Sequence, residues 1–167
     1  MSDTTKRIFL GICILLPFIA YCVYYYGIMI NNAPYKFSEF ESFKYQYGVG
    51  DSLINRYDSK TGVFQHLDKS DSLIKTTVKL NKDDLLYLHR KAAEQGFWNF
   101  PKYLLGRDTI ASKKSQHIYI QYNYQRKSKD VLIDVEYNDD VKLRDAAKQL
   151  SDEISKMLSD VYDRGRK

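Results

Sequence analysis

A run without a single charged residue, from Ile8 to Ile30, constrains this chain more than any other feature. Its sequence is IFLGICILLPFIAYCVYYYGIMI. In an α-helix these roughly 23 residues would extend for about 35 Å, which is enough to cross the hydrocarbon core of a bilayer. The run therefore predicts one transmembrane helix over residues 8–30.

A cleaved signal peptide and a lipoprotein signal are the other two interpretations of this run. A cleaved signal has a shorter apolar core and small residues before the cut, whereas this run continues through tyrosines to Tyr26 and beyond. A lipoprotein signal would place a small residue directly before the modified cysteine, but Tyr21 precedes Cys22. We therefore interpret the run as a retained membrane anchor.

The residues that flank the run predict its orientation. Lys6 and Arg7 lie immediately before it, and positive residues favour the cytoplasmic side of a membrane. Residues 1–7 would then form a cytoplasmic tail and residues 31–42 a juxtamembrane connector. We expect a single-pass protein of the cell membrane whose C-terminal domain lies outside the cytoplasm.

After the connector, alternation of apolar and polar residues predicts strands. Phe43, Tyr45 and Tyr47 would share one face of the first strand, and Gly48 after them indicates a bulge or bend. Two further stretches flank the turn sequence DSKTG and predict a hairpin, and the amphipathic stretch LIKTTVKL predicts a fourth strand. We therefore expect four strands before the first helix of this domain.

Two helices complete the predicted domain. The first begins after Asn81, whose side chain can cap it, and ends at Gly96, which favours a left-handed stop. The closing helix starts near Asn138 and carries apolar residues at spacings of three and four. Residues 43–163 are thus predicted to be an α+β domain, an antiparallel sheet packed by two helices on one face in the order β-β-β-β-α-β-β-α. Residues 164–167 would be a basic tail.

Between these helices, the stretches SQHIYIQYNY and DVLIDVEY predict a second hairpin with the basic tip QRKSK. We expect a register that pairs Tyr122 with Ile133 and Ile120 with Val135. The polar residues of its other face would then project together, although a solvated sheet face is an alternative interpretation. With the single tryptophan, they are the candidate binding residues: Tyr119, Gln121, Asn123, Asp134, Glu136 and Trp98.

The segment GFWNFP, residues 96–101, gathers three large aromatic side chains in one short connection. A small domain has little apolar surface to spare, so leaving all three in water would forgo a large part of its core. We expect Phe97 and Phe100 to be buried between the first helix of the domain and the sheet, and Trp98 to be partly exposed at the edge.

No assembled catalytic or metal-binding motif occurs in the sequence. The three histidines, His66, His89 and His117, lack metal-ligand spacing and are expected at the surface or at an edge. There is no Gly-rich phosphate loop and no serine nucleophile elbow, and both cysteines lie inside the apolar run. We therefore expect no catalytic residue, no metal and no cofactor.

Charge does not indicate a nucleic-acid partner. The chain carries 26 Lys and Arg against 21 Asp and Glu, a net charge of +5, and the two signs interleave along most of its length. Such a distribution is typical of a solvated surface rather than a concentrated phosphate-binding field. The expected partners are therefore the membrane and a protein of the envelope.

The segment GFWNFP, which leaves an Asn/Asp-capped helix and precedes a hairpin and a closing helix, resembles small extracytoplasmic bacterial domains of uncharacterised function. The resemblance covers about residues Asp51 to Val161. It implies an α+β fold and a location in the bacterial envelope, and it implies no active-site residues.

Together these features predict a membrane-tethered binding or interaction module at the surface of the cell envelope. A small membrane-anchored hydrolase or transferase is the alternative from another class, and a deep pocket that gathers a histidine with carboxylates or serine would favour it. An immunity-type inhibitor of a toxin is a second alternative. The sequence does not decide whether the protein is an enzyme, but it favours a protein without catalytic activity.

Overall fold

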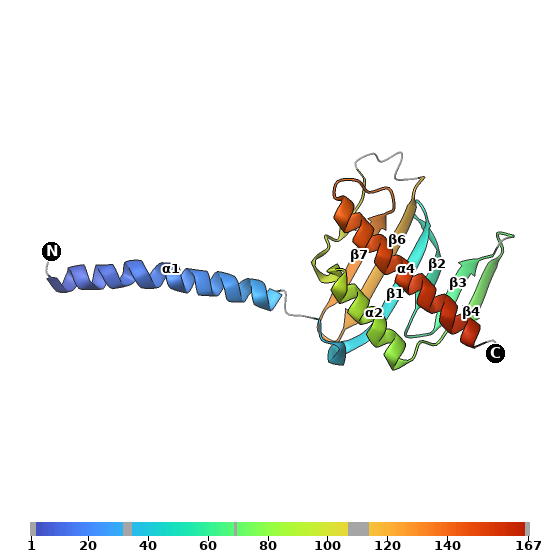
Figure 1. Cartoon of the computed structure of the whole chain (residues 1–167), viewed down its shortest axis with the longest axis horizontal. Helices are drawn as coiled ribbons and strands as arrows, with labels where there is room; N and C mark the ends of the chain where they lie inside the picture. The colour runs from blue at the N-terminus through green and yellow to red at the C-terminus, as the bar shows by residue number, and fades with distance from the viewer. Residues whose placement is uncertain (1–2, 32–34, 69, 107–113, 166–167) are drawn as a thin grey trace. The chain divides into compact units, whose positions relative to one another are not determined.

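The computed structural model of the chain describes residues 3–31, 35–68, 70–106 and 114–165, and in the first range it describes side chains only for residues 9 and 11–26. The chain divides into two compact units, Met1–Pro34 and Tyr35–Lys167 (Figure 1). Each unit has its own architecture.

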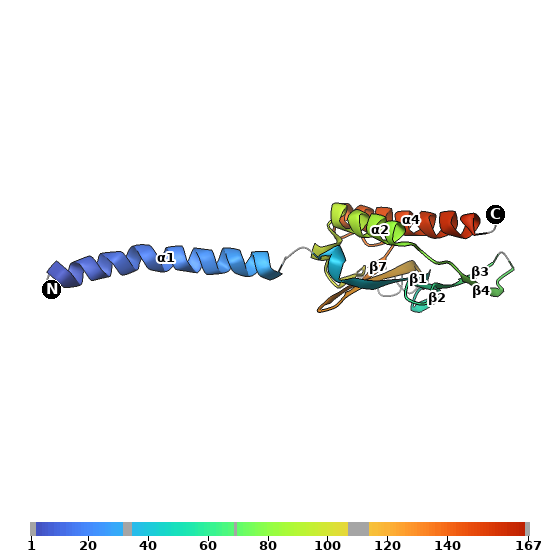
Figure 2. The same ribbon diagram turned by 90° about the horizontal axis from the view of Figure 1, so that it is seen from below.

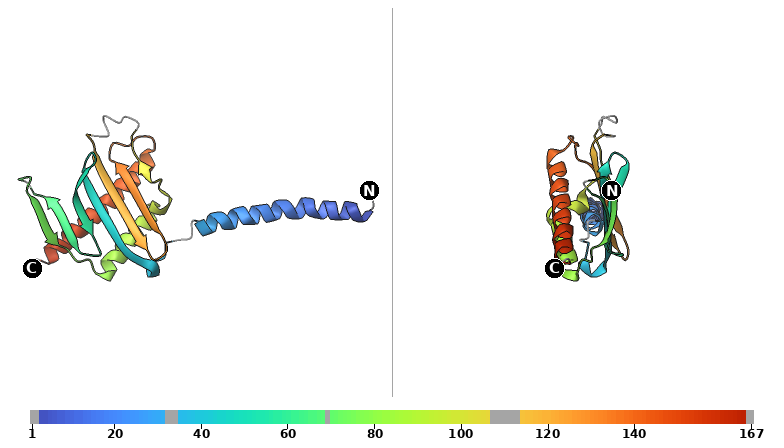
Figure 3. Two further views of the ribbon diagram at one scale, coloured as in Figure 1. Left: turned by 180° about the vertical axis from the view of Figure 1, so that it is seen from behind. Right: turned by 90° about the vertical axis from the view of Figure 1, so that its right-hand side faces the viewer.

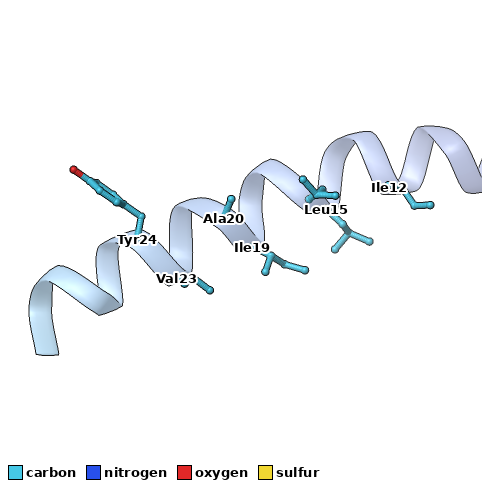
Figure 4. A pocket seen from close by; sticks show the side chains of 7 residues that line it. Ile12, Leu15, Ile19, Ala20, Val23 and Tyr24 are labelled. Carbon is cyan, nitrogen blue, oxygen red and sulfur yellow. The ribbon is translucent and has the colours of Figure 1, made fainter.

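The first unit contains one helix, α1 (Asp3–Asn31), with Pro17 inside it. Within the described part of the chain, no helix is both long enough and apolar enough to cross a membrane. Along one side of α1 lies an open apolar hollow of about 710 Å³ (Figure 4). It is lined by Ile12, Leu15, Leu16, Ile19, Ala20, Val23 and Tyr24.

The second unit has the predicted α+β fold. In the described residues a seven-stranded sheet has the order β4-β3-β2-β1-β6-β7-β5. The strands are β1 (Phe40–Val49), β2 (Ser52–Asp58), β3 (Val63–Leu67), β4 (Leu73–Thr77), β5 (Tyr103–Leu104), β6 (Gln116–Tyr124) and β7 (Ser128–Asp134). The expectation of a purely antiparallel sheet was wrong, because the two-residue strand β5 pairs with β7 in parallel.

Helices α2 (Lys82–Glu94) and α4 (Val141–Arg164) cover one face of the sheet (Figure 2). Viewed from behind, the strands lie in front of both helices (Figure 3). The Tyr87 hydroxyl donates to Glu153 over 2.8 Å, and the Arg164 guanidinium donates to Asp84 over 3.1 Å. The second bond joins the beginning of α2 to the end of α4, and the first joins a later residue of α2 to an earlier residue of α4, so the two helices run antiparallel.

Helix boundaries follow from capping side chains. The Asn81 side chain accepts from the Asp84 N–H and the Asp84 carboxylate accepts from the Asn81 N–H, which confirms the predicted start of α2. Gly96 has a φ of 70° and confirms the predicted stop. The closing helix begins at Val141 rather than near Asn138, because Asp140 is the residue whose side chain accepts from an N–H of the first turn.

The core lies between the sheet and the two helices. Alternate residues of the central strands point towards the helices, as alternation along a strand requires, and most of them are buried. The buried ones are Phe43 and Tyr45 in β1 and Ile118, Ile120, Tyr122 and Tyr124 in β6. The largest fully buried side chains are Phe43, Tyr57, Leu88, Phe97, Leu104, Ile120, Tyr122, Ile133, Leu150, Ile154 and Leu158, with Val78.

Gly48 sits at an irregularity in the pairing of β1 with β2, which confirms the predicted bulge. A Cβ built at this position would lie 1.9 Å from the Ser52 carbonyl oxygen. Since no side chain can approach a backbone oxygen so closely, the turn between the two strands requires glycine here.

The predicted register of the β6–β7 hairpin was wrong by four residues. Tyr122 pairs with Lys129 and Ile120 pairs with Val131. The tip is shorter than expected, because the Tyr124 N–H donates to the Lys127 carbonyl and β7 already begins at Ser128. A shift by an even number of residues leaves every side chain on its predicted face.

Candidate binding site

A groove lies between helix α4 and strands β1 and β3, on the helix-covered face of the sheet. It encloses about 280 Å³, close to the lower limit of volumes that are typical of small-ligand sites. We call it the α4 groove, and it is lined by Tyr45, Tyr47, Phe64, His66, Ser155, Leu158, Ser159 and Tyr162.

The α4 groove follows from the alternation of residues along β1 and from the spacing of serines along α4. Tyr45 and Tyr47 are alternate residues of β1 and therefore share the face towards the helices. On α4, Ser151, Ser155 and Ser159 follow one another at intervals of four, which places them along one side of the helix. The groove is open because this side of the helix carries small hydroxyl side chains where a core helix would carry large apolar ones.

The Tyr45 hydroxyl holds the two elements together. It lies 2.8 Å from Ser151 Oγ and 2.8 Å from Ser155 Oγ. Burial raises the pKa of the Tyr45 phenol, and burial likewise raises the pKa of Tyr47. Both phenols are therefore neutral near pH 7 and can donate or accept hydrogen bonds.

His66 contributes an aromatic ring to the lining of the groove and a polar atom without a hydrogen bond among the described residues. Its ring lies 4.8 Å from the ring of Phe64 in a stacked arrangement. The buried Nδ1 atom of His66 has no hydrogen-bond partner among the residues that the structure describes. A buried polar atom without a hydrogen bond lowers the stability of the fold. A ligand in the groove that bonds to this nitrogen would remove that penalty.

A second hollow of about 350 Å³ adjoins the α4 groove. Tyr45, Tyr47 and Ser155 line both of them, so the two hollows lie side by side beneath the same helix. Lys148 and Asp152 contribute charged groups to the second hollow. The combined surface offers aromatic rings at one end and a cation and an anion at the other.

Three of the residues predicted to bind lie together on the opposite face of the sheet. Tyr119, Gln121 and Asn123 alternate with the buried residues of β6, as predicted. Their neighbours on β1 are Gln46 beside Tyr119 and Lys44 beside Gln121. They do not contribute to the α4 groove, because the sheet separates the two faces.

Asp134 is on the same face of the sheet but is buried, and Glu136 lies outside the sheet. Asp134 ends β7, pairs with His117 and is 1% exposed. Glu136 lies beyond the strand and is exposed, and its N–H donates to the Asp134 carboxylate over 2.9 Å. The four-residue register shift explains these positions, because it pairs Asp134 with His117 instead of Gln121 and leaves Glu136 beyond the end of β7.

Asp134 instead belongs to a buried polar cluster with Ser115 and His117. The Ser115 hydroxyl donates to Asp134 Oδ1 over 2.6 Å, and His117 Nε2 lies 3.8 Å from Asp134 Oδ2. A nucleophilic serine would donate its proton to the histidine, whereas this serine donates to the carboxylate. The cluster therefore has the residue types of a hydrolase triad, but the described hydrogen bond of its serine is to the carboxylate.

The histidine expectation was wrong for two of the three residues. His89 is 8% exposed and His117 is 5% exposed, so neither lies at the surface. Each has a polar neighbour that compensates for its burial: the carboxylate of Asp134 for His117, and the carbonyl of Tyr35, 3.0 Å from Nε2, for His89. Burial lowers the pKa of His89, which keeps the ring neutral near pH 7.

The aromatic residues around Trp98 behave as predicted. Phe97 is fully buried, Phe100 is 4% exposed and Trp98 is half-buried. The segment forms a short 3₁₀ helix, η2 (Phe97–Asn99), rather than an extended chain. We call the group of Tyr35, Phe97, Trp98, Tyr122 and Tyr124 the Trp98 cluster, in which the Tyr35 and Trp98 rings stack at 4.5 Å.

In the described ranges, no three His, Cys, Asp or Glu side chains gather in a way that could hold a metal ion. Neither a protein-family model nor a curated protein matches this sequence. The α4 groove is thus identified by its geometry alone. Sequence reasoning missed it, although the serines at intervals of four in an otherwise amphipathic helix were a visible signal.

Proposed function

We propose that this chain is a membrane-tethered binding module of the bacterial cell envelope, and that its partner engages the α4 groove. The observation that carries the proposal is the groove itself. It is concave, mostly aromatic and apolar, and it contains a few polar groups that can orient a ligand.

Binding is favoured over catalysis by the state of these polar groups. The groove contains neutral phenols and serine hydroxyls, and Tyr45 is already engaged with two serines. None of the serines that line it is hydrogen-bonded to a histidine among the described contacts, so none is activated as a nucleophile. The small hydrolase or transferase alternative would instead need the buried cluster of Ser115, His117 and Asp134, where the serine bonds to the carboxylate.

The tether is supported by the sequence of the first unit. The run from Ile8 to Ile30 is uncharged, and within it the side chains of residues 8, 10 and 27–30 lie outside those that the structure describes. Every large apolar side chain that is described in α1, from Phe9 to Tyr26, is exposed within its unit. A helix that is apolar on all sides requires apolar surroundings, and a single-pass membrane anchor provides them. Lys6 and Arg7 favour a second unit outside the cytoplasm.

The tether is tested by alkaline extraction of membranes from cells that express the full chain. An integral anchor keeps the protein in the membrane pellet, whereas release into the supernatant would contradict the tether. A reporter that is active only in the cytoplasm, fused after Lys167, should be silent.

The groove is tested by photocrosslinking in cells. A benzophenone amino acid is introduced at Ser159, which lines the groove, or at Lys156, an exposed neighbour on α4 that does not. We expect one discrete adduct from position 159 and none from position 156. Equal adducts from both positions, or none from position 159, would contradict the assignment. If the adduct contains a toxin domain, the protein is an immunity-type inhibitor.

A further inference from the structure

The Trp98 cluster forms one end of the second unit together with exposed cations, and this end is the part of the unit that the chain joins to α1. Residues 32–34 alone separate Asn31, the last residue of α1, from Tyr35. An extended chain covers about 3.3–3.6 Å per residue, so the connection cannot reach beyond about 14 Å. If α1 is anchored in a bilayer, Tyr35 is kept near the membrane surface whatever the orientation of the second unit.

Cations converge on this end from two places in the sequence. Lys36 follows Tyr35 and is exposed, and Arg126 is exposed at the tip of the β6–β7 hairpin. Lys127, beside Arg126, holds its ammonium 3.9 Å from the centre of the Tyr35 ring. The Gln125 N–H donates to the Glu39 carbonyl over 2.9 Å, which fixes the hairpin tip against the start of β1.

The segment that follows Tyr35 also carries carboxylates. Glu39 and the exposed Glu41 are the carboxylates in the first residues of η1 (Phe37–Glu39) and β1, against the cations of Lys36, Arg126 and Lys127. Basic residues beside half-buried tyrosine and tryptophan rings are the combination that suits the headgroup region of a membrane. The cations would be attracted by anionic lipids, and the rings tolerate an environment that is partly apolar.

We propose that the end of the second unit formed by Tyr35, Lys36, Trp98, Arg126 and Lys127 docks on the anionic headgroups of the membrane in which α1 is anchored. This inference rests on the proposed tether and adds an orientation to it. None of the five docking residues lines the α4 groove, so the docking uses a different set of residues from the proposed partner site.

Trp98 provides the readout, since it is the only tryptophan of the chain. The full chain is reconstituted into vesicles that contain a dansyl-headgroup lipid, and energy transfer from Trp98 is measured. One set of vesicles contains phosphatidylcholine, and in the other about one lipid in four is phosphatidylglycerol. We expect transfer to be about twofold higher in the anionic vesicles and to fall to the neutral level in high salt, which screens the attraction.

Two double variants of equal charge locate the contact. Lys36→Gln with Arg126→Gln removes two exposed cations from the docking end and leaves Lys127 on the Tyr35 ring. Arg56→Gln with Lys75→Gln removes two exposed cations from β2 and β4. This control pair is remote from the docking end, because Arg56 pairs with Gln46, which lies about 20 Å along β1 from its first residue, Phe40. The first pair should abolish the increase in anionic vesicles and the second should preserve it.

The outcomes separate docking from tethering. Protein that floats with the vesicles but gives equal transfer in both lipid mixtures overturns the docking and leaves the tether intact. Equal loss in both double variants also overturns it, because the attraction would then reflect net charge alone. Protein that does not float with either set of vesicles overturns the tether, and the docking with it. Equal melting temperatures of the variants show that the substitutions leave the fold unchanged.

Discussion

The Trp98 cluster and the α4 groove lie on the same face of the same sheet, and both are rich in aromatic residues. In the Trp98 cluster the rings contact one another closely, with Phe97 and Tyr122 fully buried. In the α4 groove the rings of Tyr45, Tyr47 and Phe64 line a hollow of about 280 Å³. Aromatic content alone therefore does not tell a core from a binding site.

The difference comes from the helix above each end. Leu88 and Ala92 of α2 are fully buried and belong to the same core as Phe97. Over the groove, α4 presents Ser155 and Ser159, which are too small to fill the space above Tyr47 and Phe64. Helix residues of small volume keep this end open, and they supply the hydroxyl groups that a ligand can use.

The largest expected effect on stability is at the packed end of the sheet, next to the Trp98 cluster. Phe100→Ala should lower the free energy of unfolding by about 3–5 kcal/mol, because it leaves a cavity in a packed core, and Trp98→Ala should cost clearly less because Trp98 is half-buried. Chemical denaturation of both variants measures the difference. Equal losses would show that Trp98 is as deeply packed as Phe100 and would contradict its predicted position at the edge of the core.

At the groove, Tyr45→Phe should lower the free energy of unfolding by about 1–2 kcal/mol, since it leaves the buried Ser151 hydroxyl without its tyrosine partner. Tyr47→Phe is the matched control, because no hydrogen bond is found for its hydroxyl among the described contacts, and its effect should stay within about 0.5 kcal/mol. Equal effects of the two variants in thermal unfolding would contradict the network drawn around Tyr45.

His89, which lies beside Trp98 and Tyr124, should make the stability of the fold depend on pH. Burial lowers the pKa of this histidine from its usual 6.5, so the unfolded chain binds a proton before the folded one does. Stability should therefore be full above pH 6.5 and fall as the pH drops from 6.5 towards the lowered value, by at most about 1.4 kcal/mol per pH unit. Comparing unfolding curves of the wild type with those of His89→Gln at several pH values isolates this contribution. If the free energy of unfolding depends on pH equally in both proteins, the effect does not come from His89.

The smallest expected effect is at the junction of the two helices. Arg164→Ala removes the guanidinium that lies 3.1 Å from Asp84, but the arginine side chain is 57% exposed and Asp84 keeps its bond to the Asn81 N–H. The loss should be below about 1 kcal/mol. A loss of several kcal/mol in denaturant titration would mean that α4 depends on this contact rather than on its buried face.

Local chemistry could be predicted from the sequence where one or two residues decide it. Asn81 and Gly96 bound α2 because a capping side chain and a positive φ depend on single residues. The faces of β6 and β7 were predicted correctly because alternation has a period of two. The register between them was not, because it depends on how tightly the chain turns after Tyr124.

The groove could not be predicted because its residues come from β1, β3 and α4, which are far apart in the sequence. Tyr45 and Ser155 are separated by 110 positions, and only the packing of α4 across β1 brings them together. The same is true of Ser115 and Asp134, whose hydrogen bond depends on the hairpin register. The candidate residues on the outer face, such as Tyr119 and Gln121, were placed on the correct strand but on the opposite face from the groove.

The most direct test of the difference between the two ends is an NMR titration of the full chain in lipid nanodiscs with phenol, a probe that matches the aromatic and hydroxyl lining of the groove. At millimolar phenol we expect the backbone amide signals of Tyr47, His66 and Ser159 to shift together, while those of Phe97 and Trp98 stay in place. Shifts confined to the Trp98 cluster, or no shifts in the groove at these concentrations, would contradict the assignment of the α4 groove as the binding site.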